Sequence, residues 1–186
     1  MASKLRVDSI LPVDGAPTGG GGGIIQVLQA TKTDTDSTSS TPFADILTVS
    51  ITPKSKTSKF LLLGDLKIGY SSYTASVFWK FVRDSTDIFV GDADGSRTRC
   101  TWGIEDHHNN TAIYQLDSAF GMFLDSPNTT SAITYKVQWA AETATGYLNR
   151  TGNDGNSSPY PRTASSLTVM EVCLLYTSDA ADDRDS

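Results

Sequence analysis

The sequence has few cysteines, few basic residues and no long apolar run. Two of its 186 residues are Cys, and 15 Lys and Arg stand against 21 Asp and Glu, which gives a formal net charge of −6. Because nucleic-acid-binding proteins usually present a basic face, this balance argues against nucleic acid as a partner. The clearest apolar cluster is residues 60–63, and no apolar run approaches the roughly 18 residues of a membrane-spanning helix, so we expect no membrane insertion.

The first 23 residues differ in character from the rest. Residues 1–18 contain two early cations but no apolar stretch behind them, so we expect no secretory signal peptide. Their alternating polar and apolar residues and their prolines favour a short extended segment. Residues 19–23 are five consecutive glycines, which are conformationally permissive and predict a flexible linker.

The last fourteen residues, 173–186, break the pattern of the chain before them. The string from Cys173 to Asp182 resembles the translation of a transposase adapter used in shotgun sequencing, and we interpret 173–186 as a non-native tail; the alternative is a genuine acidic tail. Without it the net charge is −3 and Cys100 is the one cysteine. A single cysteine allows no intrachain disulfide, so we expect Cys100 to be a small, buried or half-buried apolar residue.

From residue 24 onward the apolar pattern has a period of two. Ser and Thr together make up 45 residues, and turn dipeptides such as Asp94-Gly95 separate short apolar runs. The spacing predicts strands at 24–31, 44–51, 59–68, 75–84, 87–91, 97–103, 111–124, 132–142, 145–150 and 165–172. Turns at these intervals are typical of sandwiches and barrels. We therefore expect an all-β fold over 24–172, an antiparallel, jelly-roll-like β-sandwich.

Several segments form a recognisable framework: Leu5–Pro12 with Gly15–Thr18, Ile25–Thr35, Ser50–Pro53 with Ser58–Leu61, Phe81–Asp84 with Gly91–Arg97, Phe123–Pro127 with Thr134–Gln138, and Leu167–Glu171. Together they resemble tail-fibre or virion structural proteins of tailed phages, particularly those in marine and metagenomic collections. The resemblance spans nearly the whole body of the chain. Its segments are framework signatures and not catalytic ones.

The resemblance implies a non-enzymatic virion protein, a homotrimer at or near the host-contacting tip of a tail fibre, made in the host cytoplasm. Residues 1–18 would then attach to a tail or baseplate protein, and the β-domain would bind a host surface glycan or protein. The chain has no long fibrous shaft, which leaves open a complete short fibre, a tip subunit or a decoration protein. The alternative function is a structural connector or capsid decoration protein without receptor binding.

Receptor binding would require aromatic faces and polar donors on loops, because loops on a rigid scaffold commonly carry recognition. The residues that fit are Arg97, Arg99, Trp102, Tyr147, Asn149, Arg150 and Tyr160. The segment 149–162 is the strongest candidate for a variable binding loop. Ordinary packing in the core or between subunits is the alternative role for these aromatic residues.

The sequence offers little for catalysis or for cofactors. It has no Gly-x-Ser-x-Gly segment and no internal repeat of the kind found in polysaccharide-cleaving tail spikes, so enzymatic attack on a polysaccharide ranks third among the functions. His107 and His108 are weak metal candidates, because adjacent residues of a strand point to opposite faces. A polar loop is the preferred interpretation, and we expect no cofactor.

Overall fold

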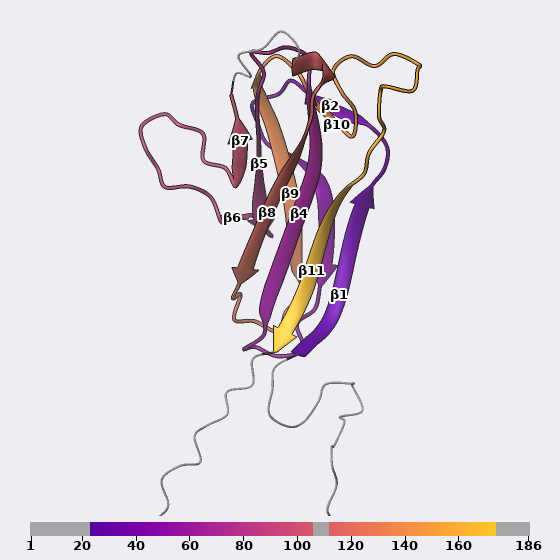
Figure 1. The fold of residues 1–186 in the computed structure, drawn as a ribbon. Helices are drawn as coiled ribbons and strands as arrows, with labels where there is room; N and C mark the ends of the chain where they lie inside the picture. Colours follow the sequence, from indigo (N-terminus) through magenta and orange to yellow (C-terminus); the bar gives the residue numbers. More distant parts are fainter. Residues whose placement is uncertain (1–22, 106–111, 174–186) are drawn as a thin grey trace, which may run out of the picture.

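The computed structural model describes residues 23–105 and 112–173, and nearly all regular structure in these residues is β (Figure 1). The one short helical turn among them is a 3₁₀ helix, η1 (Ala112–Tyr114). The strands are β1 (Gly23–Lys32), β2 (Asp36–Thr38), β3 (Ala44–Ile51), β4 (Lys59–Tyr70), β5 (Ser76–Arg83), β6 (Thr86–Ile88), β7 (Trp102–Ile104), β8 (Leu116–Asp125), β9 (Ile133–Thr143), β10 (Gly146–Leu148) and β11 (Ser165–Cys173).

The strands form two antiparallel sheets that pack face to face. In the first sheet β11 lies between β1 and β4, β8 pairs with the other edge of β4, and β10 and β2 extend its upper part. In the second sheet β9 lies between β3 and β5, and β6 and β7 pair with the far edge of β5. The orders β1–β11–β4–β8 and β3–β9–β5–β7 are those of a jelly roll. The predicted fold class is confirmed.

The core lies between the sheets and follows the alternation of the sequence. In β4 every second residue from Phe60 to Ile68 points inward, while Leu61, Leu63 and Asp65 point outward. Trp79 fills the centre and is fully buried against two glycines, Gly64 of β4 and Gly121 of β8. A Cβ atom at Gly121 would lie 2.5 Å from the Trp79 ring, so glycine is required there for the sheets to meet at this distance.

Buried polar groups tie elements together at the lower end of the sandwich. Arg83 donates to both carboxylate oxygens of Asp125 at 2.8 Å, which joins β5 to the end of β8 in the opposite sheet. Glu171 of β11 is fully buried, and its carboxylate accepts hydrogen bonds from the Gln26 side chain and from the Lys54 backbone N–H. These contacts satisfy buried charge, which would otherwise destabilise the fold.

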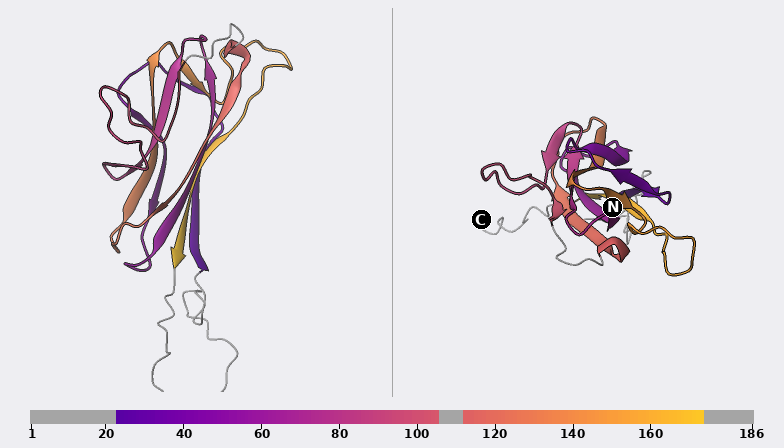
Figure 2. Two further views of the ribbon diagram at one scale, coloured as in Figure 1. Left: turned by 60° about the vertical axis from the view of Figure 1, so that its left-hand side comes forward. Right: turned by 90° about the horizontal axis from the view of Figure 1, so that it is seen from above.

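The two ends of the sandwich differ in what they carry. Gly23 pairs with Cys173, so β1 begins and β11 ends at the same end of the molecule. The segment 149–164, which leads into β11, lies at the opposite end together with η1 (Figure 1). Figure 2 shows the same separation in a second view. The chain therefore enters and leaves at one end, and its long loop lies at the other.

Most predicted strands are present, with corrections. The predicted strand 97–103 is reduced to Trp102–Ile104, because residues 91–100 form a loop. The predicted strand 111–124 starts only at Leu116, after the 3₁₀ turn. The predicted strands 87–91 and 145–150 are shortened to Thr86–Ile88 and Gly146–Leu148. The three-residue strand β2, which pairs with β10, was not predicted.

The predicted N-terminal attachment segment 1–18, linker residues 19–22 and tail residues 174–186 lie outside the described residues.

Candidate functional site

The predicted recognition residues fall into two groups on different sides of the molecule. Arg97, Arg99 and Trp102 belong to the segment after β6, whereas Tyr147, Asn149, Arg150 and Tyr160 belong to β10 and the segment after it. Viewed from above, the loops 89–101 and 149–164 project in different directions (Figure 2). The seven residues therefore lie in two separate regions of the molecule.

The loop 89–101 is a side loop held by its own contacts. Arg97 pairs with Asp94 at 2.9 Å and is largely exposed, and Arg99 donates through Nε to the Gly91 carbonyl at 2.7 Å. Gly95 has a φ of +59°, which confirms the predicted Asp94-Gly95 turn. Trp102 lies opposite Trp79 in the β5–β7 ladder and packs against the core. Trp102 thus has a packing role, and Cys100 beside it is half-buried as expected.

Asn149 anchors the longer loop from inside the protein. Its side chain is fully buried, its φ is +61°, and its amide donates to the carbonyls of Lys32 and Asp34 at 2.8 and 2.9 Å. Its side-chain oxygen accepts from the Ser165 hydroxyl at 2.7 Å. The prediction that Asn149 contacts a receptor directly is corrected: the buried amide has no exposed surface and instead fixes the start of the loop.

The Arg150 side chain extends from this anchor back over β10. Its guanidinium lies over the Tyr147 ring, 3.6 Å from the ring centroid, in a cation–π contact. Asp154 accepts from Arg162 and lies 3.7 Å from Arg150. The carboxylate thus links the two guanidinium groups, and the arrangement brings Tyr147, Arg150, Asp154 and Arg162 into one cluster.

Beside this cluster lies an open hollow of about 530 Å³, lined by residues 154–158 with Tyr160 and Arg162. Tyr160 is half-buried, and its hydroxyl accepts from the Asn153 amide at 3.3 Å. The hollow presents an aromatic ring, hydroxyls, an amide, a carboxylate and a guanidinium. This mixture of one flat apolar face with many short hydrogen-bonding groups suits a polyhydroxylated ligand better than an apolar one.

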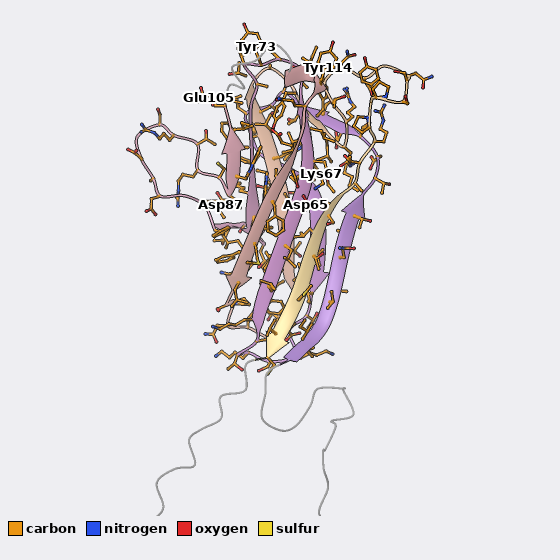
Figure 3. The ribbon with its side chains drawn as sticks, in the orientation of Figure 1. Asp65, Lys67, Tyr73, Asp87, Glu105 and Tyr114 are labelled. Carbon is orange, nitrogen blue, oxygen red and sulfur yellow. The ribbon has the colours of Figure 1, made fainter. Side chains whose placement is uncertain are left out.

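We name the surface formed by Tyr147, Arg150, Asp154, Tyr160 and Arg162 the distal loop surface. Three of its members, Tyr147, Arg150 and Tyr160, were predicted as recognition residues, and Asp154 and Arg162 were included only within the candidate loop 149–162. Asp154 and Arg162 belong to the site because their side chains pair across the loop. A hydrophobic repeat in the sequence does not predict such an ion pair. Two further exposed tyrosines, Tyr73 and Tyr114, lie at the same end of the molecule (Figure 3).

The described residues contain no cluster of metal-binding side chains. Within residues 23–105 and 112–173, no group of three or more His, Cys, Asp or Glu side chains is arranged to hold a metal ion. His107 and His108, the weak metal candidates, lie outside the described residues. No helix in the described part of the chain has the length and apolar character to cross a membrane.

Comparison with known proteins assigns the chain to no family. No protein-family model matches the sequence, and no curated protein matches it. Among solved structures, that of infectious bursal disease virus Gx strain is 10% identical, with a TM-score of 0.41 over 94% of this chain. T=1 particles derived from infectious bursal virus give 13% identity and a TM-score of 0.38 over 94%.

The chain spans 46% and 45% of the length of these two structures' chains. At such identities and TM-scores the likeness carries no inference about this chain. The assignment of a jelly roll stands on the strand order given above.

Proposed function

We propose that the chain is a non-enzymatic virion structural protein, a homotrimeric tail-fibre or fibre-tip domain that attaches to a host surface glycan through the distal loop surface. The observation that carries this proposal is the polarity of the molecule. Gly23 and Cys173 are paired at one end. β11 runs to that end from Ser165, which lies beside the distal loops. The eight steps along the nine residues of β11 separate the two ends by about 26 Å, at about 3.3 Å per step.

This polarity suits attachment. A module whose chain connections leave at one end can be joined to a tail at that end and present its opposite end to a cell. The resemblance of the framework segments to tail-fibre proteins supports the same arrangement. Jelly rolls occur both in viral shells and in lectins, which is compatible with the proposal as a fold-level analogy only.

The distal loop surface has the chemistry for a glycan. Sugar rings stack their apolar C–H faces on aromatic rings, and their hydroxyls take hydrogen bonds from guanidinium groups and give them to carboxylates. Tyr160, Arg162 and Asp154 provide these three kinds of group within one hollow. A single shallow site of this kind binds weakly, and three linked copies raise the avidity by about 10² to 10⁴ without new contacts.

The test uses the full chain, fluorescently labelled, on an array of immobilised bacterial lipopolysaccharides and capsular polysaccharides. We expect retention on a subset of these glycans and at least about a tenfold loss for Arg162→Ala, the size of effect expected for a charged hydrogen bond. Arg97→Ala is the matched control, because Arg97 is also an exposed loop arginine paired with an aspartate. It should bind like the wild type.

Retention of no glycan would overturn the receptor part of the proposal. A loss in Arg97→Ala with normal binding by Arg162→Ala would overturn the assignment of the surface. Release of reducing sugar from a bound polysaccharide would overturn the non-enzymatic part.

A further inference from the structure

The outer face of the first sheet is apolar at its centre. Register places Val27, Met170, Leu61 and Leu124 side by side across the strands β1, β11, β4 and β8. The next outward-facing position of the β4–β8 pair holds Leu63 beside Met122. We name these six side chains the apolar face. Met122, Val27 and Leu124 are 55%, 52% and 46% exposed, although large apolar side chains gain most from burial.

The outer face of the second sheet has the opposite character. There Lys136 pairs with Asp45 and Lys80 pairs with Asp87, each at 2.7 Å. The hydroxyls of Ser50 and Thr134 also lie side by side across β3 and β9 at 3.1 Å. An antiparallel sheet with one solvated face normally alternates apolar-in and polar-out. The second sheet follows this rule, and the first sheet departs from it over the apolar face.

The apolar face also adjoins an edge strand. Among the described residues β8 pairs only with β4, so its other edge has no neighbouring strand. Phe120, 53% exposed, extends the apolar side chains along this strand. Natural proteins usually protect an edge with charge, proline or a cover, because an apolar edge invites association. Phe89 of the loop 89–101 stacks on Phe123 of β8. The outward-facing Phe120, Met122 and Leu124 stay exposed, and these side chains have the features of an interface.

We propose that the apolar face is the surface at which copies of this chain pack against one another. Its six side chains carry no charge, so a partner needs no opposite charge to fit it. The nearest charges above it, Asp65 and Lys67, already pair with each other at 2.7 Å (Figure 3). A second copy offers a matching uncharged surface.

The area of the face sets how strongly copies can associate through it. Each outward side chain covers about 6.6 Å along its strand and one strand spacing of about 4.8 Å, so the six side chains cover on the order of 200 Å². That is about a quarter of the roughly 800 Å² that one partner contributes to a standard interface. Two copies packed face to face would associate weakly, whereas three copies around a common axis bury all three faces together. The number of copies rests on the proposed function.

The location of the face fits the same arrangement. It lies in the half of the sheet nearest Gly23 and Cys173, whereas the distal loops lie beyond Ser165. Copies that pack through this face bring their chain connections together and leave the distal loop surfaces free. The inference thus supplies the contact that a multivalent attachment protein requires.

The test is the native mass of the full chain by light scattering over a wide range of concentrations. We expect three times the chain mass of 19.9 kDa for the wild type. Met122→Lys should give a folded monomer, since its exposed side chain can take a lysine without entering the core. Thr48→Lys is the matched control, because Thr48 is an exposed strand residue on the outer face of the second sheet, which we call the polar face. This variant should keep the wild-type mass.

Val27→Lys tests the other side of the face, and near-ultraviolet circular dichroism shows whether each variant is folded. A wild type that is monomeric at every concentration overturns the inference, as does a Met122→Lys variant that assembles like Thr48→Lys. Native mass requires no ligand, so failure here is distinct from failure of glycan binding on the array.

Discussion

The Tyr135 hydroxyl donates a hydrogen bond of 2.7 Å to the carboxylate of Asp125 and so joins β9 to the last residue of β8 in the opposite sheet. A similar bond of 2.8 Å runs from Tyr70 to Asp117 near the start of β8. Burial raises the pKa of both tyrosines well above the ordinary value, and the hydrogen bond to a carboxylate raises the pKa further. The edge strand β8, which carries Met122 and Leu124 of the apolar face, is therefore held at both of its ends.

These raised pKa values predict a loss of stability in alkali. Above about pH 10 a tyrosine in the unfolded chain releases its proton, whereas Tyr70 and Tyr135 in the folded chain keep theirs. The folded state then binds more protons, so the free energy of unfolding falls by up to about 1.4 kcal/mol per pH unit for each tyrosine. Urea unfolding between neutral pH and pH 11 measures this slope.

Tyr135→Phe should lower stability at neutral pH by about 1–2 kcal/mol, because Asp125 loses one donor, and should flatten the alkaline slope. Tyr73→Phe is the control, since Tyr73 is 45% exposed. An alkaline slope that is the same in Tyr135→Phe and the wild type would contradict this interpretation of the hydrogen bond.

Gly121→Ala should destabilise the protein by about 1–3 kcal/mol, the usual range for overpacking a core. The new methyl group would lie 2.5 Å from the Trp79 ring, and the two sheets would have to move apart. Gly91→Ala has open space around its Cβ and should leave the stability unchanged or slightly higher. Equal thermal midpoints for both variants would show that the sheets accommodate the methyl group.

Glu171→Gln should lower the free energy of unfolding by about 1–3 kcal/mol. The glutamine NH₂ group cannot accept, so either the Lys54 N–H or the Gln26 amide would lose its buried partner. Glu142→Gln, at an exposed position of β9, is the control and should have little effect in urea unfolding. If the two variants unfold alike, the buried carboxylate does not hold the lower end together.

Asn149→Gly should weaken both the stability of the loop and glycan retention, although Gly tolerates the φ of +61°. The variant keeps the backbone conformation accessible and removes only the amide that bonds Lys32, Asp34 and Ser165. We expect a loss of about 1–3 kcal/mol, in the range for buried groups left without partners. Unchanged protease sensitivity of the segment 149–164 would argue against the anchoring role.

The period-two pattern was sufficient to predict the fold because it follows from side-chain direction in a strand. The predicted strand 44–51 coincides with β3, since Leu47, Val49 and Ile51 alternate with polar residues as a half-buried strand requires. The short strand β2 carries no such signal. Its three residues are Asp, Ser and Thr, and they are strand only through pairing with β10.

The candidate site was predictable in part for the same reason. Tyr147 and Arg150 are near in sequence, and the strand end at Leu148 brings their side chains together. Arg97 lies far from Arg150 because its loop connects strands of the second sheet, whereas Arg150 follows β10 of the first sheet. The local sequence pattern does not predict to which sheet a strand belongs. The burial of Asn149 likewise depends on residues more than a hundred positions away, at Lys32 and Asp34.

Hydrogen–deuterium exchange of the full chain, with and without a polysaccharide that the array retains, locates the glycan-binding surface. If the distal loop surface binds the glycan, peptides from the segment 149–164 exchange more slowly with the polysaccharide, and the loop 89–101 is unchanged. Protection confined to the loop 89–101, or to the strands of the polar face, would contradict recognition through the distal loop surface.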